Sequence, residues 1–175
     1  MQDSATNSSI DPHQLERLLT YCTDFAKQML VQCGEFYPFG AVIKKGGEFS
    51  AVGGYTGEEL PPRQEVYLFL QGAFTADFAK GNLEAAALAV DVKIPQQYHP
   101  PHPDGIRVLI ECEGYARLFY IPYSVTKPGF LGRLANRRGT VACGEIITVD
   151  VTPSLTQNTG KTAGTAGGKP DDSVG

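Results

Sequence analysis

The sequence predicts an α+β domain, in which a single antiparallel sheet of five or six strands carries two main helices. Three observations predict it: a long amphipathic stretch near the start, two apolar runs joined by a glycine turn, and later segments in which apolar and polar residues alternate. The predicted order is helix, two strands, helix and three strands, followed by a sixth strand.

The first helix is expected between Asp11 and Gly34. Asp11 is a favourable N-cap, Pro12 suits the first helical position, and Gly34 suits the position after the last turn. Apolar residues recur between them in steps of three and four. They form one stripe that predicts a buried face: Leu15, Leu18, Leu19, Cys22, Phe25, Ala26, Met29, Leu30 and Cys33.

A β-hairpin is expected next, because the apolar runs 41–43 and 49–52 flank a turn that contains two glycines. An aromatic corner separates this hairpin from the helix. We expect Phe36 and Phe39 to fill the junction between helix and sheet, although aromatic clusters are also common at interfaces.

The second helix is expected after Pro61 and Pro62 and before Gly81. Gly72 inside it costs about 1 kcal/mol relative to alanine, which indicates close backbone packing. Residues 83–94 are alanine-rich, but their second half is β-branched and alternating, so we expect a strand, with a helical start at 83–87 as the alternative. The predicted buried stripe of the second helix is Val66, Phe69, Leu70, Ala73, Phe74 and Phe78.

Three more strands are expected at 106–113, 116–123 and 141–151. The segment 117–121 is bulky and largely apolar on both faces, so it is expected to be central and covered on both sides, or to meet a partner with half of its length. Residues 1–10 and 152–175 are polar and expected to be disordered, which leaves a single domain at 11–151.

The formal net charge of −4 is too small to indicate a polyanionic or polycationic partner, so nucleic acid is not expected to bind. Neither a signal peptide nor a membrane-spanning run is recognisable. The four cysteines form no C-x-x-C pair, and Cys22, Cys33 and Cys112 are expected to be buried free thiols. These features predict a cytoplasmic protein without a cofactor.

The best candidate for a metal site is the loop that carries His99, His102 and Asp104, because imidazole and carboxylate groups suit zinc or iron. Three prolines interrupt this loop and tend to splay its side chains, so a solvated loop is the favoured interpretation. Glu111 and Glu113 lie two residues apart on one strand, and we expect them on a solvated face with ion pairs rather than in an acid–base pair.

Two other chemistries have weaker candidates. Cys143 lies close in sequence to Arg137 and Arg138, the setting that a reactive thiolate needs, but no histidine base is near it in sequence. The basic segment 127–138 lacks interleaved aromatic residues for base stacking, so a solvated loop is favoured over a nucleic-acid arm.

The element order over residues 11–123 resembles that of the roadblock and profilin-like architectures, in which a five-stranded antiparallel sheet carries helices. The segments Glu35-Phe36-Tyr37-Pro38-Phe39-Gly40, Asp104-Gly105-Ile106-Arg107-Val108 and Ile121-Pro122-Tyr123 also resemble those of small bacterial proteins of unassigned function. Neither resemblance implies a catalytic residue.

The leading hypothesis is therefore a non-catalytic, cytoplasmic protein-binding or regulatory module that associates with another protein or with itself. Its expected binding residues are Tyr37, Phe119 and Tyr120, which have no evident place in the core. The alternative is a small enzyme or a ligand- or metal-binding domain that uses the loop His99–Asp104 together with Glu35 or Glu111.

Overall fold

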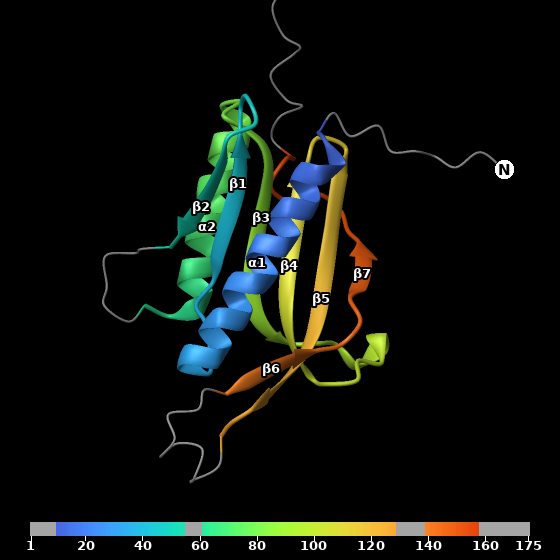
Figure 1. Ribbon diagram of the computed structural model, residues 1–175. Helices are drawn as coiled ribbons and strands as arrows, with labels where there is room; N and C mark the ends of the chain where they lie inside the picture. The colour runs from blue at the N-terminus through green and yellow to red at the C-terminus, as the bar shows by residue number, and fades with distance from the viewer. Residues whose placement is uncertain (1–9, 55–60, 129–138, 158–175) are drawn as a thin grey trace, which may run out of the picture.

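The computed structural model describes residues 10–54, 61–128 and 139–157 and confirms the α+β class and the predicted order of elements. Figure 1 shows two long helices against one curled antiparallel sheet. The elements are α1 (Pro12–Cys33), β1 (Phe39–Lys44), β2 (Phe49–Gly53), α2 (Arg63–Ala79), β3 (Leu83–Lys93), the 3-10 helix η1 (Gln96–Tyr98), β4 (Asp104–Cys112), β5 (Tyr115–Thr126), β6 (Thr140–Cys143) and β7 (Ile147–Asp150).

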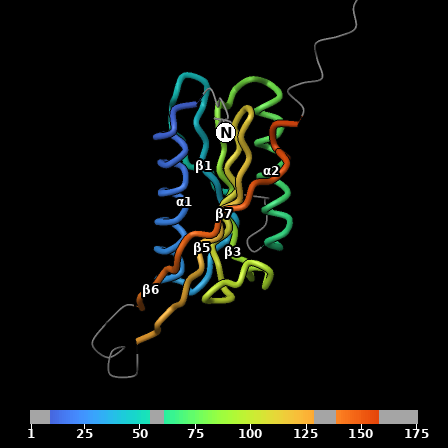
Figure 2. Tube along the Cα trace, turned by 90° about the vertical axis from the view of Figure 1, so that its right-hand side faces the viewer, coloured from blue at the N-terminus to red at the C-terminus, as the bar shows by residue number. Residues whose placement is uncertain are grey.

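The two helices lie on opposite faces of the sheet, as Figure 2 shows edge-on. The strand order is β2-β1-β3-β4-β5-β6, and β7 also pairs with β5. Residues 117–120 of β5 pair with β7, and residues 123–126 pair with β6. The long strand β5 is therefore covered along its outer edge by two short strands, where the sequence predicted one continuous strand at 141–151.

Helix α1 has the ends that its sequence predicts. The Asp11 carboxylate accepts a hydrogen bond from the His13 amide, and Gly34 ends the helix in the left-handed conformation with φ of 79°. The apolar stripe packs on one face of the sheet, and its centre is formed by residues four apart: Leu18, Cys22, Ala26 and Leu30.

Helix α2 covers the other face with a narrower stripe than the sequence predicted. Val66, Leu70, Phe74 and Phe78 are buried, again four residues apart. Phe69 was predicted to be buried and is instead 51% exposed. It lies outside the stripe of buried residues that packs on the sheet. The predicted stripe combined both sides of an unusually apolar helix.

The central strand β3 explains the alanine-rich segment, and the alternative of a helical start at 83–87 is wrong. Alternate alanines face opposite helices: Ala85, Ala87 and Ala89 join the α1 core, whereas Ala86 joins the α2 core. Small side chains are needed here because both faces of the strand are covered. Gly40 on the neighbouring strand shows the same restriction, since an added Cβ would lie 2.6 Å from the Phe74 ring.

The aromatic corner between α1 and β1 belongs to the core. Phe36 and Phe39 are both buried, with ring centroids 5.7 Å apart in an edge-to-face arrangement. The expectation that they fill the junction of helix and sheet is confirmed.

Glu111 corrects a prediction, because it is fully buried on the α2 face of β4 rather than solvated beside Glu113. Its carboxylate accepts hydrogen bonds from the amides of Ser154, Leu155 and Thr156 and from two hydroxyls. Leu155 is itself fully buried in the α2 core, and Ile10 is buried in the α1 core. The packed chain thus extends past residue 151.

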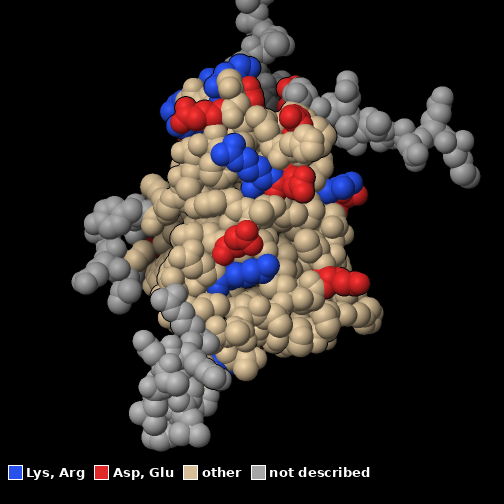
Figure 3. Space-filling view, viewed as in Figure 1, with Lys and Arg blue, Asp and Glu red and all other residues tan. Residues whose placement is uncertain are grey.

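The surface that carries α1 shows positive and negative groups close together and no broad area of one charge (Figure 3). No helix in the described part of the chain is long and apolar enough to cross a membrane. Residues 55–60 and most of the basic segment, residues 129–138, lie outside the described residues.

Candidate functional site

A cleft of about 310 Å³ opens where α2 begins, beside the connection from α1 to β1. Arg63 and Tyr67 of α2 form one wall, Pro38 forms another, and the floor comes from β3 and β4, including Asp91 and Arg107. A larger cleft, of about 570 Å³, lies at the other end of α2 near Ile10 and Thr156, beside the points where the described chain stops.

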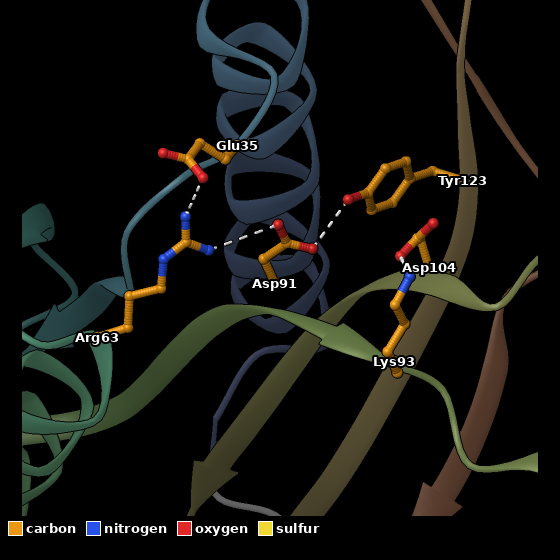
Figure 4. Close-up of polar contacts among 6 residues, drawn as sticks. All are labelled: Glu35, Arg63, Asp91, Lys93, Asp104 and Tyr123. Atoms are coloured by element: carbon orange, nitrogen blue, oxygen red, sulfur yellow. Dashed lines mark hydrogen bonds and ion pairs between the residues drawn. The ribbon is translucent and has the colours of Figure 1, made fainter.

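A chain of polar contacts borders the smaller cleft (Figure 4). The Arg63 guanidinium lies between two carboxylates, 2.5 Å from Glu35 and 3.8 Å from Asp91. The Asp91 carboxylate also accepts a hydrogen bond of 2.9 Å from the Tyr123 hydroxyl. These contacts join α2, the connection after α1, β3 and β5 at one end of the sheet.

Burial is the main influence on the two partners at the end of this chain of contacts. It raises the pKa of Asp91 above its ordinary value, against the lowering effects of Tyr123 and Arg63. Burial, followed by the hydrogen bond to Asp91, also raises the pKa of Tyr123. Tyr123 therefore stays protonated at neutral pH and serves as a donor, not as a base.

Arg107 differs from Arg63 because no described residue supplies an anionic partner or a hydrogen-bond acceptor for it. Its Nε is buried without a hydrogen bond, and its guanidinium lies over the Tyr67 ring, 5.4 Å from the ring centroid. An arginine with unpaired donors on a cleft surface is suited to bind a carboxylate or another anion.

The predicted metal ligands do not form a site. Asp104 begins β4 and pairs with Lys93 across the strand pair, while His99 is an exposed residue in the left-handed conformation after η1. Over the ranges that the structure describes, no group of three or more His, Cys, Asp or Glu side chains could hold a metal ion. The arrangement of His99, His102 and Asp104 therefore gives no support to the metal alternative.

The three predicted binding residues have different positions. Tyr37 is 38% exposed at the cleft end of the molecule, with the Arg63 guanidinium over its ring. Phe119 is partly buried against the α1 core, and Tyr120 is buried and contacts the Tyr98 ring in a tilted arrangement, with ring centroids 5.5 Å apart. Phe119 and Tyr120 lie on β5, which has a neighbouring strand on each of its edges: β4 on one, and β6 and β7 on the other.

Two of the four free thiols are buried and two are exposed. Cys22 and Cys112 are buried as expected, and burial raises their pKa values to about 12 and about 11. Cys33, the last residue of α1, is exposed, contrary to the prediction. Cys143 is exposed as well, but partial burial of its thiol raises the pKa above the ordinary value.

Sequence reasoning missed an exposed apolar surface on α2, which we call the α2 outer face. Leu68 is 52% and Phe69 is 51% exposed, the highest values for large apolar residues in the described chain. The available signal was that α2 has apolar residues on every side, which is unusual for a helix with one solvent-facing side. The α2 outer face consists of Glu65, Leu68, Phe69, Gly72, Ala76 and Ala79.

Comparison with known proteins adds no relative. The chain matches no protein-family model, no curated protein and no solved structure. The roadblock-like and profilin-like element order and the likeness to small bacterial proteins both stay predictions.

Proposed function

We propose that this protein is a non-catalytic binding module that associates with a second copy of itself through the α2 outer face. The observation that carries the proposal is the pair Leu68 and Phe69, adjacent residues that are each about half exposed. Exposed neighbouring apolar side chains of this size are typical of interaction surfaces.

The α2 outer face is complementary to itself when two copies of α2 run antiparallel. Large side chains lie on the N-terminal side of Gly72 and small ones, Ala76 and Ala79, on the C-terminal side. A two-fold axis at Gly72 places Leu68 of each copy opposite Ala76 of the other, so large groups meet small ones. Such a pairing is isologous and closes at two copies.

Charge supports the same orientation. Glu65 lies in the first turn of α2 and Lys80 caps its end, and both are exposed. In the antiparallel pair the start of each α2 lies beside the end of the other, so Glu65 of one copy approaches Lys80 of the second. A parallel pair would place like charges together at both ends.

Gly72 has a use in this arrangement that it lacks in the single chain. It was expected to mark close backbone packing, but apart from the adjoining backbone of its own helix no atom lies within 4 Å of the position that its Cβ would occupy. A glycine where two helices cross lets their axes approach closely. Close contact with the second copy then explains why a glycine, which weakens a helix, occupies position 72.

The location belongs to the proposal too. The four cysteines are free, as is usual in a reducing compartment, and we place the protein in the cytoplasm on that ground.

The test is the mass in solution over a range of concentrations, measured by light scattering after size exclusion. The wild type is expected to reach a stable dimer mass, and Leu68→Ser with Phe69→Ser to be monomeric at the same concentrations. Ile146→Ser is the matched control, because Ile146 is 50% exposed but lies between β6 and β7.

A second variant separates association from folding. Gly72→Leu improves helix propensity by roughly 0.8 kcal/mol, so the single chain should unfold at a higher temperature while the dimer is lost. A wild type that stays monomeric at high concentration, or a dimer that survives Gly72→Leu and the double serine variant, would contradict the proposal.

A further inference from the structure

We infer that the cleft at the start of α2 binds a small organic molecule through a carboxylate group, with Arg107 as the principal recognition residue. This inference is independent of the proposed self-association, because the cleft and the α2 outer face use different residues. Four features of the cleft support it.

The first feature is the unsatisfied guanidinium. Arg107 lies on β4 with its Cα opposite that of Val90, so its side chain projects on the α2 face of the sheet. Its buried Nε has no acceptor among the residues described. Buried donors are normally satisfied in native proteins, and a missing ligand is one of the ordinary reasons for an exception.

The second feature is that Arg107 is held in place. The Tyr67 ring supports one face of the guanidinium at 5.4 Å from centroid to Cζ, and Tyr120 lies opposite Arg107 in the strand pairing. A guanidinium whose plane is fixed loses little freedom when it binds a carboxylate in the two-point manner that arginine favours.

The third feature is the charge of the cleft wall. Arg63 already contacts two carboxylates, those of Glu35 and Asp91. Arg107 is the cleft arginine that has no carboxylate partner among the described residues, so one local positive charge is open to a ligand. That balance suits a carboxylate better than a doubly charged phosphate.

The fourth feature is the mixed character of the cleft. Its walls include Phe36, Pro38, Val90 and Val92, which would face the apolar part of a ligand. Helix α2 also begins here, and no side chain caps its first turn. Its positive end adds a favourable contribution to an anion in the cleft.

The experiment is a titration of the full chain, monitored by amide chemical shifts and by calorimetry. Benzoate is the probe, benzamide is its neutral counterpart of the same shape, and inorganic phosphate tests the charge argument. Benzoate should bind with one site per chain and shift the amides of Gln64, Tyr67 and Val92. Benzamide and phosphate should each bind at least about 10-fold more weakly than benzoate, as expected when a charged hydrogen-bonded pair is lost.

Arg107→Gln should weaken benzoate binding by about 10-fold to 100-fold. The matched control is Arg17→Gln, because the Arg17 guanidinium also lies over an aromatic ring, Phe49 at 4.5 Å, but far along α1 from the cleft. Benzoate that shifts none of the three wild-type amides, equal binding of benzamide or phosphate, or equal losses in both variants would overturn the inference. The wild-type amide shifts keep the test decisive even where Arg107→Gln fails to fold.

Discussion

Glu111 shows how a single buried carboxylate can fix the end of a chain. It is fully buried, and none of the described lysines or arginines pairs with it. Backbone amides of three consecutive residues, at 2.8, 2.8 and 3.2 Å, replace the water that a carboxylate would bind. Through these hydrogen bonds, Glu111 holds residues 154–156 against the sheet.

Glu111→Gln is expected to lower the free energy of unfolding by about 2 kcal/mol, because an amide offers one acceptor oxygen and turns an NH₂ group toward backbone donors. Urea unfolding measures the change. Glu113→Gln serves as the control, since Glu113 is exposed and two residues away on the same chain segment. Equal stability of Glu111→Gln and wild type would show that the anchor contributes nothing.

Asp91 leads to a prediction about pH. Burial raises the pKa of Asp91 in the folded protein, so the folded state holds the proton more tightly than the unfolded state. Its contribution favours folding at acidic pH and is lost as the pH rises through the raised pKa. Asp91→Asn resembles the neutral form and can still accept the Tyr123 hydrogen bond.

We therefore expect Asp91→Asn to be more stable than the wild type at pH 7, with the difference shrinking as the pH falls through the raised pKa. Thermal unfolding from pH 3 to pH 8 measures it. A difference that grows on acidification would mean that the Arg63 ion pair outweighs the effect of burial.

At the scale of the elements, the sequence predicted those features that depend on residues close together in the chain. Caps and glycines predicted both ends of α1, and alternation of β-branched residues predicted the later part of β3. The side on which each helix packs was not predictable, because periodicity shows that a face is buried but not against which face of a sheet. Phe69 and Glu111 were misplaced for that reason, since their surroundings come from distant parts of the chain.

The same limit applies to the candidate sites. Arg107 appeared as an ordinary polar residue on an alternating strand, and only the pairing of β4 with β3 places it opposite Val90, beside Tyr67. The exposed pair Leu68 and Phe69 fits a buried helix equally well in sequence. The one available sign was that apolar residues of α2 lie on more than one side of the helix, a pattern that predicts two buried sides rather than one.

The segment after β7 gives a prediction about truncation. A chain that ends at Val151 loses the burial of Leu155 and the donors to Glu111, and we expect its free energy of unfolding to fall by roughly 3–5 kcal/mol. A chain that ends at Gln157 keeps every contact named above and is the control. Thermal and urea unfolding compare the two, and equal stability would show that residues 152–157 are dispensable.

At the scale of the whole molecule, the sheet separates two cores. Among the described residues, the α1 core and the α2 core are distinct clusters of buried side chains on the two faces of the sheet. Substitutions that do not share a packing partner usually have additive effects on stability. Each core should therefore lose stability independently of the other.

Leu18→Ala in the α1 core and Leu70→Ala in the α2 core should each cost about 2–5 kcal/mol, and the double variant should cost their sum to within about 0.5 kcal/mol. Val66→Ala with Leu70→Ala is the comparison pair, because both residues lie in the α2 core one turn apart, and we expect non-additivity there. Urea unfolding of the complete cycles measures it. Strong coupling between Leu18 and Leu70 would refute the separation.

The alanines of β3 determine how substitutions on this strand affect the two helices that cover the sheet. Side chains alternate along a strand, so the parity of a residue number decides which helix feels a substitution. A larger residue at Ala86 would displace α2 and with it the surface that α2 presents, whereas one at Ala87 would displace α1 alone. Neighbouring codons thus give evolution separate access to the two sides of the molecule.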